Sequence, residues 1–72
     1  MPNFILNSNA QSNGDHEVHN TTTGCTFMPA VSNQIDLGWH LDCSGAVAEA
    51  KRRYPNNRIN GCYYCARACH TS

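Results

Sequence analysis

Five cysteines and four histidines in a chain of only 72 residues constrain this protein more than any other feature of its sequence. Ordering such a chain costs on the order of 100 kcal/mol of conformational entropy, and a small core buries little apolar surface to offset that cost. Small domains with such cores are usually completed by disulfides or by a structural metal. We therefore expect a single domain, residues 1–72, that is held together by cysteine chemistry.

The N-terminal sequence bears on which kind of cross-link to expect. Residues 1–7 contain no basic residue and only a three-residue apolar stretch, Phe4–Leu6, which is unlike a secretory signal peptide. The chain also has no apolar run long enough for a transmembrane helix. These features predict a cytoplasmic monomer with no membrane association. Thiols persist in that compartment, and an odd number of cysteines is awkward for a disulfide framework, so metal binding is the leading interpretation.

Short polar and apolar patterns predict strands in the first half of the chain. Phe4–Leu6 and Asp15–His19 predict a β-hairpin with a tight turn at Asn13-Gly14. The Asn- and Ser-rich residues 7–13 are also compatible with a disordered tail. Gln34–Gly38 alternates polar and apolar residues, which predicts one more short strand.

The segment Cys43–Tyr54 predicts one amphipathic helix. Asp42 or Ser44 can cap its N-terminus, and Pro55 stops it. The basic run Lys51–Arg53 falls in the last turn, where it complements the negative end of the helix dipole. The predicted fold class is α+β: an N-terminal β-hairpin packed with this helix and with a C-terminal hook in which a Cys-x-x-Cys motif opens a last helix.

Two pairs of metal-ligand residues lie at opposite ends of the chain. Cys62 and Cys65 form a Cys-x-x-Cys motif, whose sulfurs can turn onto one metal while backbone N–H groups donate to them, and Gly61 permits a tight approach. His19 and Cys25 form a second pair far upstream. Together the four residues predict a tetrahedral Cys3His zinc site that clamps both ends of the chain.

His16 is the alternative to His19 as the histidine ligand. The two residues are three positions apart on one predicted strand, so their side chains should point to opposite faces. We predict His19 as the ligand because it lies closer to Cys25 in the sequence.

Cys43 and Cys69 are not needed for a four-ligand site, and three interpretations are open for them. The favoured one is that both are buried small residues that pack helix against helix. They could also form a redox-sensitive pair that closes to a disulfide. Finally, Cys69 lies four residues after Cys65 and could add to or replace a metal ligand.

The order of these features resembles the small Ada-type zinc-binding module. The resemblance is carried by the hairpin, His19-x5-Cys25, the Ala-rich segment 43–50 and Cys62-x2-Cys65. Related His-Cys-Cys-Cys modules occur at the ends of bacterial nuclease and competence proteins. The resemblance implies a zinc site from these four residues and a frequent association with DNA. In the Ada protein the first ligand is a cysteine that accepts a methyl group; His19 has no such thiolate, so repair activity is not implied.

The charges sum to zero but are segregated along the chain, because all five acidic residues precede residue 50 and all five basic residues follow it. With tyrosines between them, the basic residues could contact a phosphate backbone while the rings stack on unpaired bases. A solvated basic face is the alternative. The candidate nucleic-acid-binding residues are Lys51, Arg52, Arg53, Arg58 and Arg67.

The sequence gives little support for catalysis. Four protein ligands would fill the zinc tetrahedron and leave no open position for a reacting water. We therefore expect a non-enzymatic zinc-binding protein that acts as a binding or interaction module, with DNA, RNA or a protein as its partner. The alternative function is a thiol redox sensor or metal-handling protein that uses Cys43 and Cys69.

Overall fold

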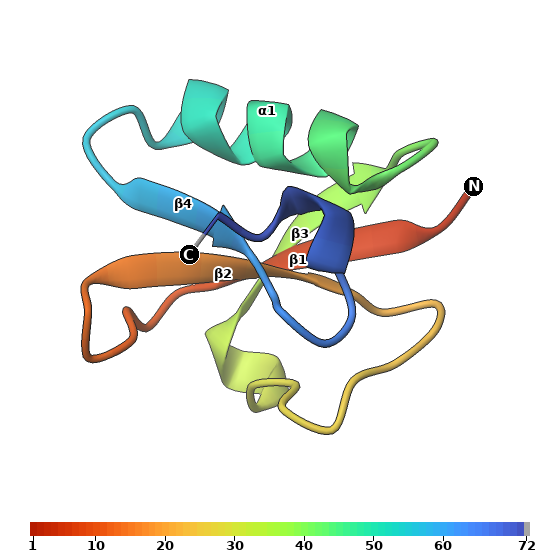
Figure 1. The fold of residues 1–72 in the computed structure, drawn as a ribbon, viewed down its shortest axis with the longest axis horizontal. Coiled ribbons are helices and arrows are strands. Elements are labelled where there is room, and N and C mark those ends of the chain that lie inside the picture. The colour runs from red at the N-terminus through yellow and green to blue at the C-terminus, as the bar shows by residue number, and fades with distance from the viewer. Residues whose placement is uncertain (72) are drawn as a thin grey trace.

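A four-stranded mixed sheet lies at the centre of the computed structural model, which describes residues 1–71 (Figure 1). The spatial order of the strands is β3-β1-β2-β4. Strand β1 pairs antiparallel with both β2 and β3, whereas β4 pairs parallel with β2. With one α-helix packed on this sheet, the α+β class is confirmed. The strands are β1 (Asn3–Asn7), β2 (Asp15–Asn20), β3 (Gln34–Trp39) and β4 (Arg58–Gly61).

The connection between β1 and β2 is longer than the tight turn predicted at Asn13-Gly14. The last paired residues of the two strands are Leu6 and Val18, and residues 8–14 run outside both strands. Gly14 has a φ of 91°, which favours glycine, and the Asn13 side chain accepts a hydrogen bond from the Asp15 N–H. Asn13 and Gly14 therefore form a turn, but this turn is only the last part of a longer loop.

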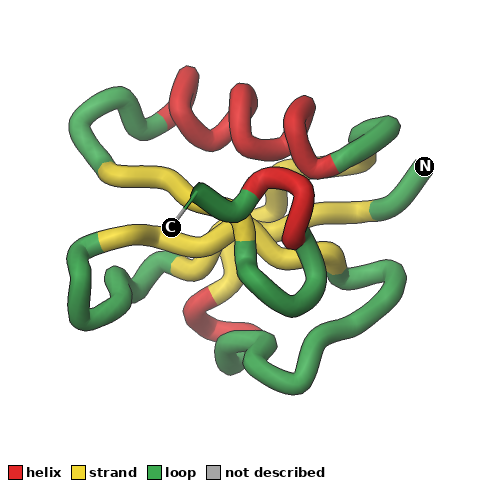
Figure 2. The backbone as a smooth tube through the Cα atoms, in the orientation of Figure 1, coloured by secondary structure: helices red, strands yellow, loops and turns green. Residues whose placement is uncertain are grey.

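Helix α1 (Cys43–Arg53) covers one face of the sheet and contacts all four strands (Figures 1 and 2). Its N-cap is Asp42, whose carboxylate accepts a hydrogen bond from the Ser44 N–H. Asp42 was one of the two residues predicted to cap the helix. Ala46 and Ala50 are completely buried, and their small side chains let the helix lie close to the sheet.

The two faces of the sheet have different roles. Phe4, Leu6 and Val18 belong to the buried core that includes α1. Ile5 and His19 are register partners in the β1–β2 pair and are also buried. Because side chains alternate along a strand, His19 points to the face of the sheet away from α1. Three of the five cysteines, Cys25, Cys62 and Cys65, meet His19 from the loops.

No α-helix follows Cys65 within the described residues, so the prediction that the Cys-x-x-Cys motif opens a last helix was wrong. Ala66 has a φ of −137° and a ψ of 46°, which is not helical, and only the single 3₁₀ turn η2 (Arg67–Cys69) follows it. A second 3₁₀ turn, η1 (Val31–Asn33), precedes β3. Among residues 1–71, no helix has the length and apolar character needed to cross a membrane.

Candidate metal centre

The four side chains predicted as metal ligands converge in the structure. His19, Cys25, Cys62 and Cys65 each offer one ligand atom, and these atoms all lie within 4.8 Å of one another. His19 and Cys62 are buried, with 1% of each residue exposed, and the other two are half-buried. A group of this composition and spacing is close enough to hold one metal ion.

The parallel pairing of β4 with β2 brings Cys62 beside His19. Val18 is the register partner of Gly61, and the next N–H, that of Cys62, donates to the Val18 carbonyl oxygen at 3.0 Å. Cys62 therefore begins its loop next to the strand position that holds His19. The sequence spacing of these two residues contains no sign of this pairing.

A turn after β2 directs the chain toward the same point. The Asn20 side-chain oxygen accepts hydrogen bonds from the backbone N–H groups of Thr22 and Thr23, at 3.0 and 3.1 Å. Gly24 has a φ of 77°, and the chain reverses there into Cys25. The turn residues between β2 and Cys25 thus position the second upstream ligand.

Two of the distances between ligand atoms match tetrahedral coordination of one metal ion, for which zinc gives the reference bond lengths. The sulfurs of Cys25 and Cys62 are 3.7 Å apart, and the Cys65 sulfur is 3.5 Å from His19 Nδ1. Zn–S bonds of about 2.3 Å and a Zn–N bond of about 2.0 Å would separate two tetrahedral sulfurs by about 3.8 Å, and a sulfur from a nitrogen by about 3.5 Å. The types of donor atom and these two distances therefore both agree with tetrahedral coordination of a metal ion.

Backbone N–H groups donate to two of the sulfurs, as expected for a Cys-x-x-Cys knuckle. The Tyr64 N–H donates to Cys62 Sγ at 3.4 Å, and the Asn20 N–H donates to Cys65 Sγ at 3.3 Å. Such donors stabilise negative charge on sulfur. The Asn20 bond also ties the end of β2 directly to the C-terminal hook.

Burial favours the neutral form of three of the four side chains in the metal-free chain. It lowers the pKa of His19, which keeps the imidazole neutral and its lone pair available. It also raises the pKa of the Cys62 thiol, and it raises that of Cys65 to about 12. A divalent cation reverses this preference, because it favours the thiolate and displaces the proton.

Glu17 is a residue of this site that the sequence analysis did not identify. Its Oε1 lies 3.7 Å from His19 Nε2, the ring nitrogen away from the thiols, and Nε2 has no hydrogen-bond partner within the described residues. Burial raises the pKa of Glu17. A ligating imidazole usually donates its second ring N–H to a carboxylate, and Glu17 lies beside that nitrogen without forming a hydrogen bond to it. The signal available in the sequence was its position two residues before His19, on the same face of the strand.

The structure places His16 outside the cluster. Its Nδ1 lies 3.0 Å from the carbonyl oxygen of Asn7, the last residue of β1. His19 is the histidine that meets the cysteines, so the choice between the two histidines agrees with the prediction.

Gly61 permits the close approach that was predicted for it. A Cβ atom at this position would lie 2.7 Å from both the Ala66 carbonyl oxygen and the Cys69 Cβ. The hook therefore folds back over Gly61 at a distance that a larger residue does not allow.

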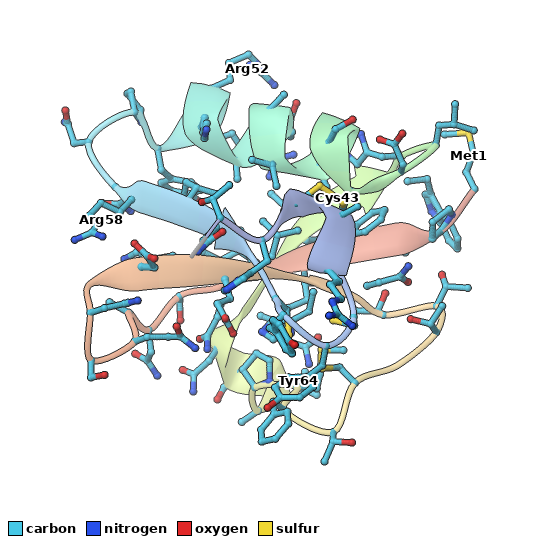
Figure 3. The ribbon with its side chains drawn as sticks, viewed as in Figure 1. Met1, Cys43, Arg52, Arg58 and Tyr64 are labelled. Carbon is cyan, nitrogen blue, oxygen red and sulfur yellow. A yellow bond between two sulfur atoms is a disulfide. The ribbon has the colours of Figure 1, made fainter. Side chains whose placement is uncertain are left out.

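Cys43 and Cys69 form a disulfide, so the favoured interpretation of two unbonded buried residues was wrong (Figure 3). Their Cα atoms are 6.2 Å apart across 26 positions of sequence. The bond joins the first residue of α1 to the end of η2 and occupies both sulfurs, which excludes Cys69 as a metal ligand. Disulfide formation was the second of the three interpretations.

The basic residues do not gather on one surface. Arg52 and Arg53 both bind Glu49 at 2.6 Å, and Arg58 binds Asp15 at 2.9 Å. Arg52 extends from α1 on the side of the molecule opposite Tyr64 (Figure 3). Arg52, Arg53 and Arg58 therefore have carboxylate partners. The basic and tyrosine side chains that do meet lie at two places, Lys51 and Arg58 with Tyr54 around one hollow and Arg67 over the Tyr63 ring.

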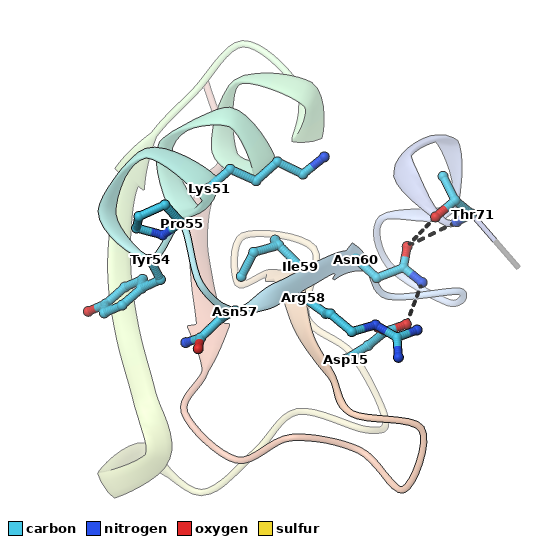
Figure 4. A pocket seen from close by; sticks show the side chains of 9 residues that line it. All are labelled: Asp15, Lys51, Tyr54, Pro55, Asn57, Arg58, Ile59, Asn60 and Thr71. Carbon is cyan, nitrogen blue, oxygen red and sulfur yellow. Dashed lines mark hydrogen bonds and ion pairs between the residues drawn. The ribbon is translucent and has the colours of Figure 1, made fainter.

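A hollow of about 520 Å³ lies between the end of α1 and β4 (Figure 4). Its buried polar side chains bind one another: the Asn60 amide donates to an Asp15 oxygen at 3.3 Å, and its own oxygen accepts from the Thr71 N–H at 2.9 Å. Arg58 binds the other Asp15 oxygen. These polar groups stabilise the β2–β4 junction and have no need of a ligand.

Comparison with known proteins finds no match to a family model, to a curated protein or to a solved structure. The His-Cys-Cys-Cys cluster does not by itself identify an Ada-type domain, so that resemblance stays a prediction. The site's chemistry rests on its own four residues.

Proposed function

We propose that this chain is a small zinc-binding protein in which His19, Cys25, Cys62 and Cys65 form a structural Cys3His site, and that it acts as a binding or interaction module. The observation that carries the proposal is the convergence of the four ligand atoms within 4.8 Å. Three thiolates and an imidazole in tetrahedral spacing favour zinc over hard cations, which prefer oxygen.

The proposed site is structural, not catalytic. Four protein ligands complete the tetrahedral shell, so no position remains for a water that the metal could activate. The ligands come from β2, from the loop after β2 and from the C-terminal hook, so the metal would fix two loops relative to the sheet and to each other. The function would then depend on the side chains that these two loops expose to a partner.

Metal analysis of the purified full chain tests this proposal. We expect one zinc per chain in the wild type and in His16→Gln, and loss of zinc in His19→Gln and Cys62→Ser. Cobalt substitution gives a second readout, because tetrahedral Co²⁺ bound by thiolates has intense visible absorption. A wild-type chain that takes up no zinc, or a His19→Gln chain that retains it as well as His16→Gln does, contradicts the proposal.

Nucleic-acid association is the finer form of this function that the sequence suggested, and the carboxylate partners of Arg52, Arg53 and Arg58 leave few cations for it. If single-stranded DNA binds, affinity should fall with salt with a log–log slope of about −0.7 for each phosphate contacted. Charge reversal at Lys51 and Arg67, the two cations without such a partner among the described residues, should remove the binding. If no gel shift of the DNA is seen even at low salt, nucleic-acid association is ruled out.

The Cys43–Cys69 bond favours a second candidate function, that of a thiol redox sensor. A dithiol reductant would supply two electrons and two protons, so that each cysteine becomes a thiol and the reductant leaves as a disulfide. In a cytoplasm, where thiols are kept reduced, the bond would form only transiently. Thiol alkylation and mass analysis in glutathione buffers test this, and a bond that no such buffer reduces is structural only.

A further inference from the structure

Three aromatic side chains are exposed together where the two cysteine-bearing loops meet. Phe27 lies in the loop after β2, two residues after Cys25, and Tyr63 and Tyr64 are the two residues inside the Cys-x-x-Cys motif. The exposed fractions of Phe27, Tyr63 and Tyr64 are 57%, 44% and 66%. Tyr64 stacks on Phe27 with ring centroids 4.5 Å apart and meets Tyr63 edge-on at 5.1 Å. Together with Arg67, these residues are called the aromatic face.

Arg67 gives the aromatic face its one fixed charge. Its guanidinium lies over the Tyr63 ring, 4.9 Å from the centroid, and binds no acceptor among the described residues. A guanidinium stacked on a ring keeps its N–H groups free at the edge, where they can bind a carboxylate in bidentate fashion.

The composition around the aromatic face is that of a protein interface. Residues 21–33 contain no Lys, Arg, Asp or Glu, and residues 61–71 contain Arg67 alone. Centres of protein interfaces are rich in Tyr, Phe, Met and Arg and poor in Lys, Asp and Glu. Exposed aromatic rings gathered in this way mark interaction sites.

We infer that the aromatic face binds an extended, proline-containing protein segment that carries a carboxylate side chain. Proline-rich segments are already extended, so they dock on exposed aromatic rings at low entropic cost. The carboxylate pairs with Arg67, and no acidic residue of either loop repels it. The inference rests on the proposed function, because the zinc ion would hold both loops in place.

The charges argue for a protein segment over a single-stranded nucleic acid. Single-strand binders combine stacking rings with a basic groove that follows the phosphates. The aromatic face has one arginine, and Arg52, Arg53 and Arg58 bind carboxylates elsewhere on the chain. A polyanion would therefore gain stacking without the charge neutralisation that supplies most of its affinity.

Fluorescence anisotropy with the zinc-loaded full chain tests the inference. The probes are two labelled synthetic peptides with the same proline repeat, one with glutamate and one with lysine at the remaining positions. We expect the glutamate peptide to bind about tenfold more tightly, and Arg67→Gln to abolish that preference. Tyr64→Ala should weaken glutamate-peptide binding by about tenfold or more. Trp39→Ala is the control, because Trp39 is 61% exposed but makes no ring contact with the aromatic face.

Zinc content and melting temperature are measured for every variant, so that this inference and the proposed function can fail separately. A folded chain without zinc defeats the proposed function. A zinc-loaded, folded chain that ignores the glutamate peptide, or a Tyr64→Ala variant that binds it like the wild type, overturns the inference alone. Binding of oligothymidine through Tyr64 in place of the peptide assigns the face to nucleic acid. Dimerisation that Tyr64→Ala removes assigns it to a second copy. Either result also overturns the inference.

Discussion

Cys65 Sγ lies 3.5 Å from His19 Nδ1, although 46 positions of the chain separate the two residues. Bringing such distant positions together costs entropy, which contacts at both ends must offset. The parallel β2–β4 pair supplies part of those contacts. A zinc ion bound by both residues would supply the rest, so the metal would link the N-terminal strands to the C-terminal hook.

Chelation should therefore unfold the protein. A structural zinc site contributes on the order of 10 kcal/mol, which is comparable with the whole stability of a small domain. Circular dichroism with and without a zinc chelator measures the change, and added Zn²⁺ should restore the spectrum whereas Mg²⁺ should not. An unchanged spectrum and melting curve after complete zinc removal would rule out a structural role for the metal.

Removal of the disulfide should destabilise the zinc-loaded protein but leave its zinc content unchanged. The bond spans 26 positions, and closing a loop of that length lowers the entropy of the unfolded chain by an amount worth about 3.5 kcal/mol. Cys43→Ala combined with Cys69→Ala should lower the free energy of unfolding by about that amount in urea titrations. Loss of zinc from this double variant would show that one of the two cysteines supports the metal site directly.

Gly61→Ala should destabilise the fold by crowding. The new methyl group would lie 2.7 Å from the Ala66 carbonyl oxygen, and overpacking of this kind costs about 1–3 kcal/mol. Gly24→Ala is the matched control, because nothing lies within 4 Å of its Cβ position and only its φ of 77° opposes the change. Thermal melts compare the two, and a larger loss at Gly24 would contradict the crowding argument.

Glu49→Gln should lower the melting temperature through loss of the ion pairs with Arg52 and Arg53. Hydrogen bonds from these two arginines lower the pKa of Glu49 from 4.5 to about 2. A lowered pKa contributes stability that is complete above pH 4.5 and is lost as the pH falls toward about 2. The difference between variant and wild type should therefore be constant from neutral pH down to pH 4.5 and shrink below it. Glu49 is half-buried but Arg52 is exposed, so solvent reaches the ion pairs and added salt should also reduce the difference.

Features set by neighbouring residues could be predicted from the sequence. The ends of α1 follow from Asp42 and Pro55, whose effects reach only one turn. The pair Cys62 and Cys65 was recognisable because its spacing alone brings two sulfurs together. Strand alternation, a rule that also acts between close neighbours, placed His16 and His19 on opposite faces, and His19 was preferred because it lies closer to Cys25 in the sequence.

Features set by pairing between distant segments could not be predicted. Nothing in residues 58–61 indicates that they pair parallel with β2, and that pairing is what carries Cys62 to His19. The disulfide was only one of three interpretations, because its partner depends on where η2 returns to α1. The exposure of Trp39 also depends on strand order, because it ends an edge strand after Gly38, which has a φ of 82°, and 61% of the residue is exposed.

The Cys43–Cys69 bond closes a covalent ring that contains the turn between α1 and β4. Residues 55–57 of that turn are exposed, which makes the turn an accessible site for a protease. A cut there leaves two polypeptides that remain one particle, since the sulfurs still join them. Until a reductant separates them, the two pieces together have the mass of the intact protein plus one water. Gel electrophoresis without a reductant would therefore record the cut protein as undigested.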